Sequence, residues 1–167
     1  DFEMQITHVI RGEDHIANTP KQILIQETLD LPGVQYGHLP LLLGEDRTKL
    51  SKRHGDNSVR KFREQGYLPE AILNFLALLG WNPGDEREIF SAEDLIKEFS
   101  LERIHKGGAI FNVQRLDWIN GFYIRQKSLD ELTTLCKPFV PKNALDFQKQ
   151  KMIVALYQER LKKLSEI

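Results

Sequence analysis

Two lysines, Lys49 and Lys52, stand three residues apart with Ser51 between them, inside a stretch (47–56, "RTKLSKRHGD") that carries four Lys/Arg in ten residues. Ammonium groups at this spacing can close over a polyphosphate and neutralise the charge that builds up during nucleotidyl transfer. The stretch has no hydrophobic periodicity, so we expect a flexible polar loop. It is not a Walker A loop, because it has no GxxxxGK pattern. Judged on its lysines alone, a solvated surface turn explains the stretch better.

A second charged cluster, "RGEDH" (11–15), follows a strand-like stretch. Arg11 can bind a carboxylate or a phosphate, and Gly12 allows the backbone to come close to such a ligand. Asp14 and His15 can accept hydrogen bonds from ribose hydroxyls or contact an adenine. A metal site is a weak interpretation, because adjacent residues rarely point at one ion and no His-x-x-x-His spacing follows. An ion-paired approach to the next helix explains these residues about as well.

A third group of cations, Arg60, Lys61 and Arg63, lies in a helix predicted at 57–66, which Asn57 or Ser58 caps and Gly66 ends. These side chains can contact the phosphates of a nucleic acid, and such contacts set affinity and register rather than sequence choice. Taken alone, the helix is better explained as an ordinary solvated surface.

The elements that must position these residues begin with a strand, a helix and a second strand. Residues 4–10 alternate and are rich in β-branched side chains, and the apolar run 38–43 suits a buried strand. Between them, Asn18 or Thr19 caps a predicted helix. Such a βαβ unit places ligands at the carboxyl ends of its strands. The cation-rich loop, residues 47–56, follows the second strand and therefore falls where this architecture binds ligands.

Helices dominate the remaining sequence. The segment 68–80 is apolar on nearly every side, which predicts a buried helix, and "SAED" at 91–94 predicts a capping box. The aromatic-rich segment 115–126 is expected to break at Gly121, and an amphipathic helix is expected over 153–164. The predicted fold class is α/β followed by a mainly helical part, α-rich overall.

The composition is that of a soluble globular protein, with 41% hydrophobic and 28% charged residues among 167. The net charge is −1, but residues 46–63 hold seven Lys/Arg against two Asp, and residues 85–102 hold seven Asp/Glu against two Lys/Arg. Any anion binding must therefore be local. The single cysteine, Cys136, excludes an internal disulfide and a Cys-based zinc cluster. It lies between Leu135 and Lys137 in a helix-like run, so we interpret it as a packing residue. No apolar run reaches the roughly 18 residues that cross a bilayer.

Four segments, "ITHVIRGEDHIANTPKQ", "HLPLLLGEDRTKLSKR", "GYLPEAILNFLALLGW" and "FNVQRLDWINGFYIR", occur in this order. Together they resemble bacterial glutamyl-tRNA synthetases, which are class I aminoacyl-tRNA synthetases. "KLSKR" resembles the class I signature KMSKS, with Leu50 in place of Met and Arg53 in place of the last Ser. The resemblance covers essentially the whole chain. It implies a cytoplasmic glutamate–tRNA ligase that uses ATP, Mg²⁺, L-glutamate and tRNA-Glu, or also tRNA-Gln, and that binds neither membrane nor DNA.

The resemblance also implies residue roles. Lys49 and Lys52 would be catalytic, holding the ATP phosphates and stabilising the transition state of adenylation, and Arg11 would bind the glutamate substrate. The implied ATP-binding residues are Asp14, His15, Leu42, Lys49, Leu50, Ser51, Lys52 and Arg53. The implied tRNA contacts are Arg60, Lys61 and Arg63, and no metal-ligating residue is expected.

The resemblance divides the chain into three parts. Residues 1–55 would be the C-terminal part of the catalytic nucleotide-binding domain, residues 56–140 a stem-contact domain, and residues 141–167 the beginning of the helical anticodon-binding region. The family's HIGH-like signature does not occur in the sequence. Because its histidines stabilise the same transition state from the opposite side, we expect an internal fragment that is inactive alone.

Two other functions fit parts of the sequence. A non-catalytic module could dock a tRNA stem on the same basic face, although such a module needs no lysine-rich loop at the end of a strand. A helix-turn-helix DNA binder could be built on 57–66 and 68–80, although the second helix is too apolar to lie in a groove, with only Glu70 and Asn74 as polar side chains. A HIGH-type tetrapeptide upstream would support the ligase.

Overall fold

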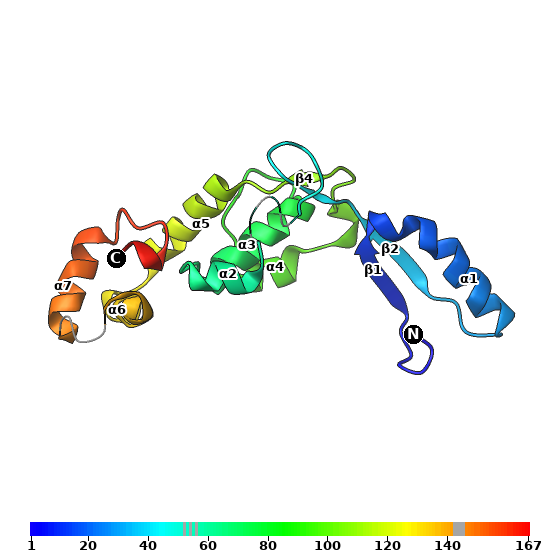
Figure 1. Ribbon diagram of the computed structural model, residues 1–167, viewed down its shortest axis with the longest axis horizontal. Helices are drawn as coiled ribbons and strands as arrows, with labels where there is room; N and C mark the ends of the chain where they lie inside the picture. The colour runs from blue at the N-terminus through cyan, green and yellow to red at the C-terminus, as the bar shows by residue number, and fades with distance from the viewer. Residues whose placement is uncertain (52, 54, 56, 142–145) are drawn as a thin grey trace.

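The computed structural model describes residues 1–51, 53, 55, 57–141 and 146–167. The molecule is elongated, and its parts follow one another along the long axis in chain order (Figure 1). A small α/β unit with the N-terminus forms one end, a cluster of helices forms the middle, and the last two α-helices form the other end (Figure 1). The predicted α/β class with a helix-rich remainder is confirmed. No helix in the described part of the chain is long and apolar enough to cross a membrane.

The N-terminal unit has the predicted strand–helix–strand order. Strands β1 (His8–Gly12) and β2 (Gln35–Leu39) are parallel, and helix α1 (Thr19–Thr28) connects them. A 3-10 helix, Glu13–Asn18, leads from β1 into α1. β1 begins at His8 rather than at residue 4, because the preceding residues form a turn closed by hydrogen bonds from Gln5 N to Phe2 O and from Ile6 N to Asp1 O.

The predicted strand at 38–43 is two strands. β2 ends at Leu39, and β3 (Leu42–Leu43) pairs in parallel with β4 (Ala109–Ile110) in a separate sheet. Pro40 lies between the two strands, and a proline has no N–H to donate to a ladder. The chain therefore leaves one sheet at this proline and enters the other.

The central core is helical. Helices α2 (Val59–Glu64), α3 (Pro69–Gly80), α4 (Ala92–Glu98) and α5 (Val113–Gln126) surround it, with a 3-10 helix at Leu101–Arg103. α3 buries only one face: Phe75 is 1% exposed, whereas Leu73 and Leu76 are 48% and 42% exposed. The expectation of a helix buried nearly all round is therefore wrong. The capping box of Ser91 and Asp94 is confirmed.

The predicted break of α5 at Gly121 is wrong, because α5 runs without interruption through this residue. Gly121 is buried, and a Cβ added there would lie 3.2 Å from the carbonyl oxygen of Leu161. The absence of a side chain at Gly121 therefore allows α5 to lie close to the backbone at Leu161.

The C-terminal end contains α6 (Leu129–Cys136), a 3-10 helix (Lys137–Phe139), α7 (Phe147–Tyr157) and a last 3-10 turn (Leu164–Glu166). The amphipathic helix predicted to reach residue 164 ends at Tyr157. The chain then turns back, and Leu161 and Leu164 are buried in the core. Cys136 is buried as expected for packing, and burial raises the pKa of its thiol to about 11.

Candidate functional site

The cation-rich loop begins as a short hairpin on β3. Leu50 N donates to Leu42 O at 2.8 Å, and Gly44 N donates to Thr48 O at 2.9 Å. Lys49 forms an antiparallel bridge with Leu43, which fixes its backbone beside the strand. The sequence predicts a polar loop without regular structure over 47–56, whereas residues 47–50 form the second arm of this hairpin. Lys52 lies outside the described residues.

The hairpin brings Lys49 to the "RGEDH" cluster. The ammonium nitrogen of Lys49 lies 2.8 Å from Oδ2 of Asp14, which belongs to the 3-10 helix after β1. The hydrogen bond from Lys49 lowers the pKa of the Asp14 carboxyl below its usual value, and the charge of the ammonium acts in the same direction. Two residues predicted from separate segments thus lie in direct contact.

Arg11 lies at the carboxyl end of β1, and neutral side chains hold its guanidinium. Nη2 of Arg11 donates to Thr19 Oγ1 at 2.8 Å and to Gln22 Oε1 at 2.7 Å. The guanidinium carbon lies 5.2 Å from the ring centroid of Tyr36, and Arg11 Nε lies 3.4 Å from Nε2 of His38. Among the described residues no carboxylate forms an ion pair with Arg11, so its positive charge is not neutralised locally. This arrangement suits an anionic ligand.

The other predicted ATP-binding residues lie along the same two segments. His15 is exposed on the 3-10 helix, and Leu42 and Leu50 are half-buried on the two arms of the hairpin. Ser51 is exposed after the second arm, and Arg53 donates from Nη2 to Thr48 Oγ1 at 2.6 Å. The hairpin and the 3-10 helix therefore form one polar surface.

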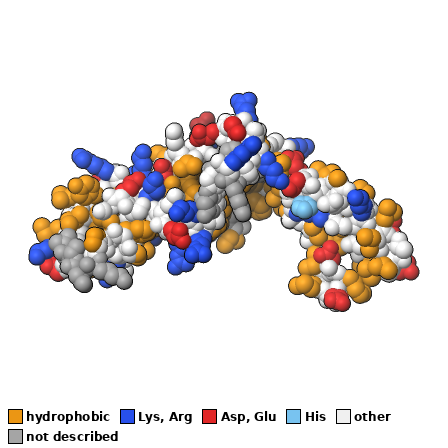
Figure 2. Space-filling view, in the orientation of Figure 1, with side chains coloured by type: hydrophobic (Ala, Val, Ile, Leu, Met, Phe, Trp, Pro, Cys, Tyr) orange, Lys and Arg blue, Asp and Glu red, His pale blue; other side chains and the backbone are white. Residues whose placement is uncertain are grey.

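Helix α2 carries the three predicted tRNA contacts. Ser58 caps the helix by accepting from Lys61 N at 3.2 Å. Arg60 and Lys61 both pair with Glu64, at 3.1 and 3.7 Å, and no ion pair involves Arg63 within the described chain. Lys and Arg side chains gather over α2 on the face shown in Figure 2. The helix therefore presents a positive surface.

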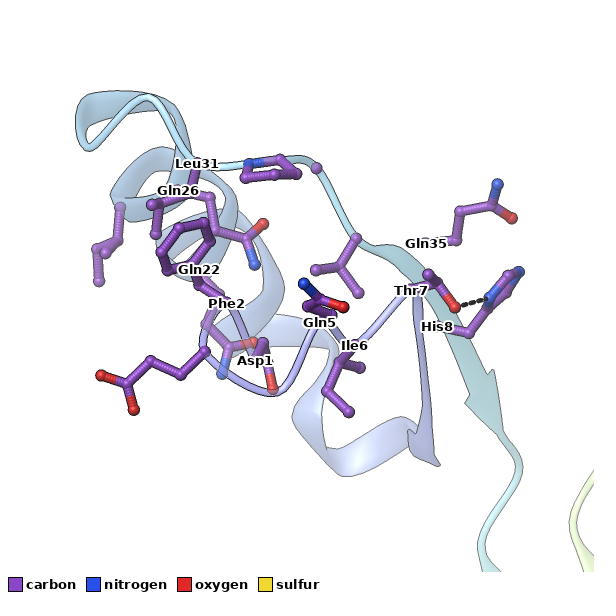
Figure 3. Close-up of a pocket in the computed structure, with 15 residues that line it drawn as sticks. Asp1, Phe2, Gln5, Ile6, Thr7, His8, Gln22, Gln26, Leu31 and Gln35 are labelled. Carbon is purple, nitrogen blue, oxygen red and sulfur yellow. Dashed lines mark hydrogen bonds between the residues drawn. The ribbon is translucent and has the colours of Figure 1, made fainter.

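A cavity of about 1010 Å³ lies at the opposite end of β1 from Arg11. Its walls come from the first eight residues, from α1 and from residues 31–35 (Figure 3). Phe2 and Ile25, which line it, are 57% and 58% exposed. Parallel α/β units bind ligands at the carboxyl ends of their strands, and this cavity lies at the amino ends. We therefore place the candidate site at the hairpin and not in this cavity.

The residues at the hairpin do not form a cage for a metal ion. Among the described residues, no group of three or more His, Cys, Asp or Glu side chains could hold one. Mg²⁺ is commonly bound by one or two carboxylates together with substrate phosphates. The described chain supplies at most part of such a site.

The model of the family "tRNA synthetases class I (E and Q), catalytic domain" matches residues 1–118, which include both strands of the βαβ unit and the whole hairpin. The chain belongs to this family.

The relatives of this class I synthetase chain support the assignment. It is 53% identical over its full length to glutamate–tRNA ligase 1 of Caldanaerobacter subterraneus subsp. tengcongensis, and 57% identical over 148 residues to glutamate–tRNA ligase of Aquifex aeolicus. A crystal structure of a glutamate tRNA ligase from Elizabethkingia meningosepticum in complex with its amino acid is 34% identical, with a TM-score of 0.85 over 98% of this chain and 37% of that chain. The chain spans about a third of the length of these relatives, 36% of the Caldanaerobacter protein.

Several residues of the candidate site carry no signal in the sequence. Thr19, Gln22, Tyr36 and His38 hold Arg11, and Glu13 accepts from Leu41 N at 3.1 Å, which ties the 3-10 helix to the start of β3. The sequence predicts neighbouring strands but not their register. The register places His38 opposite Arg11, and helix α1 brings Thr19 and Gln22 to the same guanidinium.

Proposed function

We propose that the chain is part of a glutamate–tRNA ligase that activates glutamate with ATP and transfers it to tRNA. The observation that carries the proposal is the contact between Lys49 and Asp14, which joins the lysine-rich hairpin to the cluster after β1. The relatives named as glutamate–tRNA ligases support this reaction. In it, glutamate and ATP form glutamyl-adenylate and pyrophosphate, and the glutamyl group then passes to the terminal ribose of the tRNA.

ATP would lie across the hairpin and the 3-10 helix. Asp14 and His15 would contact the ribose and the adenine, and the backbone of Leu42 and Leu50 would flank the adenosine. Lys49 would turn from Asp14 to the phosphates and act there with Lys52. Two ammonium groups would stabilise the negative charge that shifts onto the leaving pyrophosphate, which is electrostatic stabilisation without a covalent enzyme intermediate. Ser51 and Arg53 would also contact the ATP phosphates. Mg²⁺ would neutralise further phosphate charge when bound.

Glutamate would bind at Arg11. A guanidinium pairs well with a carboxylate, because its N–H groups can form two parallel hydrogen bonds. The neutral partners Thr19 and Gln22 orient Arg11 without removing its charge. The substrate carboxylate would therefore find an oriented and unneutralised cation.

The tRNA would lie along α2, with Arg60, Lys61 and Arg63 on its phosphates. Such contacts position an RNA without reading its sequence. Whether the parent protein charges tRNA-Glu only, or also tRNA-Gln, is therefore not set by this helix. We expect the parent protein to act in the cytoplasm, where tRNA is used for translation.

The test is tRNA-dependent ATP–pyrophosphate exchange with glutamate, measured on the parent polypeptide that carries this segment. Removing one group that stabilises transition-state charge typically slows a reaction about 10²–10³-fold. We expect losses of this order for Lys49→Ala and for Lys52→Ala, with unchanged folding by circular dichroism. Lys97→Ala, which removes a lysine from the acidic helix α4, is the matched control and should exchange at the wild-type rate.

Two results would contradict the proposal. Wild-type exchange in both lysine variants would remove the catalytic role of the hairpin. Exchange catalysed by the 167-residue chain alone would contradict the view that a second part of the catalytic domain supplies half of the charge stabilisation.

A further inference from the structure

A groove of about 740 Å³ runs beside α2. One wall is the basic side of the helix, and the other is formed by the end of α6 and the 3-10 helix that follows it. The side chains that decide its character are Arg60, Arg63, Glu64, Leu135, Pro138 and Phe139. We call this feature the α2 groove.

The bottom of the α2 groove is fixed by the chain that returns from α7. Leu164 N donates to Gly66 O at 3.0 Å, and Ser165 Oγ donates to Gln65 O at 2.7 Å. Gly66 has φ +85°, and a Cβ there would lie 2.8 Å from Leu164 N. These contacts hold the end of α2 against the returning chain at the bottom of the groove.

The α2 wall of the groove is positive. Glu64 is its one carboxylate among the described lining residues, and it is shared by Arg60 and Lys61. Arg63 is exposed and has no ion pair in the described chain. Two arginines against one glutamate among the described lining residues favour an anionic occupant, and Arg63 can bind a phosphate without breaking an existing pair.

The opposite wall is apolar. Leu135 and Phe139 are half-buried, and Pro138 is exposed beside them. A phosphate chain alone would leave this wall in contact with water. An unpaired nucleotide instead offers a phosphate on one side and a flat base on the other, and protein side chains commonly stack on such bases.

We propose that the α2 groove holds an unpaired nucleotide of tRNA, with its phosphate on Arg63 and its base against Phe139. The inference rests on the proposed function, because it needs tRNA to be the ligand of α2. A base-paired nucleotide does not fit, since its base stays stacked inside the duplex and cannot reach Phe139. The groove thereby contributes to the affinity for tRNA by holding a nucleotide that lies outside the duplex.

The contributions of the two walls to tRNA affinity can be distinguished by the salt dependence of tRNA binding to the parent polypeptide. Phe139→Leu should raise the Kd roughly tenfold and leave the slope of log K against log salt unchanged, because stacking releases no counterions. Arg63→Gln should lower the magnitude of that slope by about one. Phe99→Leu is the matched control: Phe99 is 48% exposed but lies in the acidic stretch 85–102, so its Kd should stay at the wild-type value.

Chemical probing of the bound tRNA identifies the nucleotide itself. We expect one or two unpaired nucleotides to be protected by the wild type and by Phe99→Leu, and to become reactive with Phe139→Leu. A footprint confined to duplex phosphates would overturn the inference, as would equal Kd values for Phe139→Leu and Phe99→Leu.

Other occupants give different results. If Phe139→Leu lowers the melting temperature of the tRNA-free parent and leaves the tRNA Kd unchanged, Phe139 packs the core without contacting tRNA and the inference is wrong. If the wild-type parent does not bind tRNA, the proposed function itself fails, and this outcome is distinct from loss of the Phe139 contribution alone.

Discussion

Lys49 and Asp14 form an ion pair whose two side chains are 58% and 40% exposed. Exposed pairs of this kind contribute little to stability, because water screens them and both side chains lose rotamer freedom. Exchange of Lys49 from Asp14 to an ATP phosphate would therefore cost little. In the free protein the pair keeps the lysine at the site, so the contact organises the site more than it stabilises the fold.

The pair predicts a specific pH behaviour. The folded-state pKa of Asp14 is lowered, so the pair favours the folded state above the unfolded pKa and loses this effect as pH falls through the folded pKa. Lys49→Gln removes the hydrogen bond and the charge, and we expect the pKa of Asp14 to rise toward 3.8 in a carbon-detected NMR titration.

Asp85 provides the internal control for this titration. Its pKa is also lowered, but hydrogen bonds from Arg87 are the cause, so Lys49→Gln should leave it unchanged. An unchanged pKa of Asp14 in the variant would show that the two side chains do not meet in solution.

Helix α2 follows the hairpin in the chain, and its C-terminal end is a tightly constrained turn. Gly66 ends the helix in the left-handed region, with Tyr67 N donating to Phe62 O at 3.0 Å. Leu164 packs against the same glycine. Both the turn and this contact therefore require a residue without a side chain at position 66.

Replacing Gly66 tests this constraint. Gly66→Ala adds a Cβ where φ is positive and where Leu164 N is 2.8 Å away, so we expect a loss of about 1–3 kcal/mol in the free energy of unfolding. Gly80→Ala is the matched control, because a Cβ at the end of α3 meets nothing within 4 Å. Equal stability of the two variants in urea unfolding would contradict the tight contact between Gly66 and Leu164.

The molecule as a whole is stabilised unevenly along its length. Among the residues that the structure describes, the central core buries sixteen in one cluster, whereas α1, β1 and β2 contain no buried residue. Large apolar side chains of the N-terminal unit are exposed, among them Ile10 at 52%, Ile16 at 53%, Leu24 at 62%, Ile25 at 58% and Leu29 at 61%. Exposed apolar area of this extent marks an interaction surface, and the relatives of full length contain further chain that could cover it.

Native-state hydrogen exchange tests this difference in stability. A two-stranded sheet without a buried face is marginal in water, so in the 167-residue chain we expect amides of β1 and β2 to show protection factors roughly 100-fold below those of α3 and α5. In the parent polypeptide the same amides should become protected. Equal protection of strands and core helices in the isolated chain would contradict this account.

The sequence alone determined the βαβ order and the α-rich class, and it singled out the residues of the candidate site. These features depend on local periodicity, capping residues and charged motifs, which are properties of short segments. The Ser91 cap and the end of α2 at Gly66 were predicted for the same reason.

Only the tertiary structure decided which of these segments meet. The pairing of β3 with β4, the uninterrupted α5 at Gly121 and the contact of Lys49 with Asp14 all depend on partners far away in the chain. The position of His38 beside Arg11 depends on strand register. Such features follow from long-range packing and pairing free energies, which no local pattern in a sequence encodes.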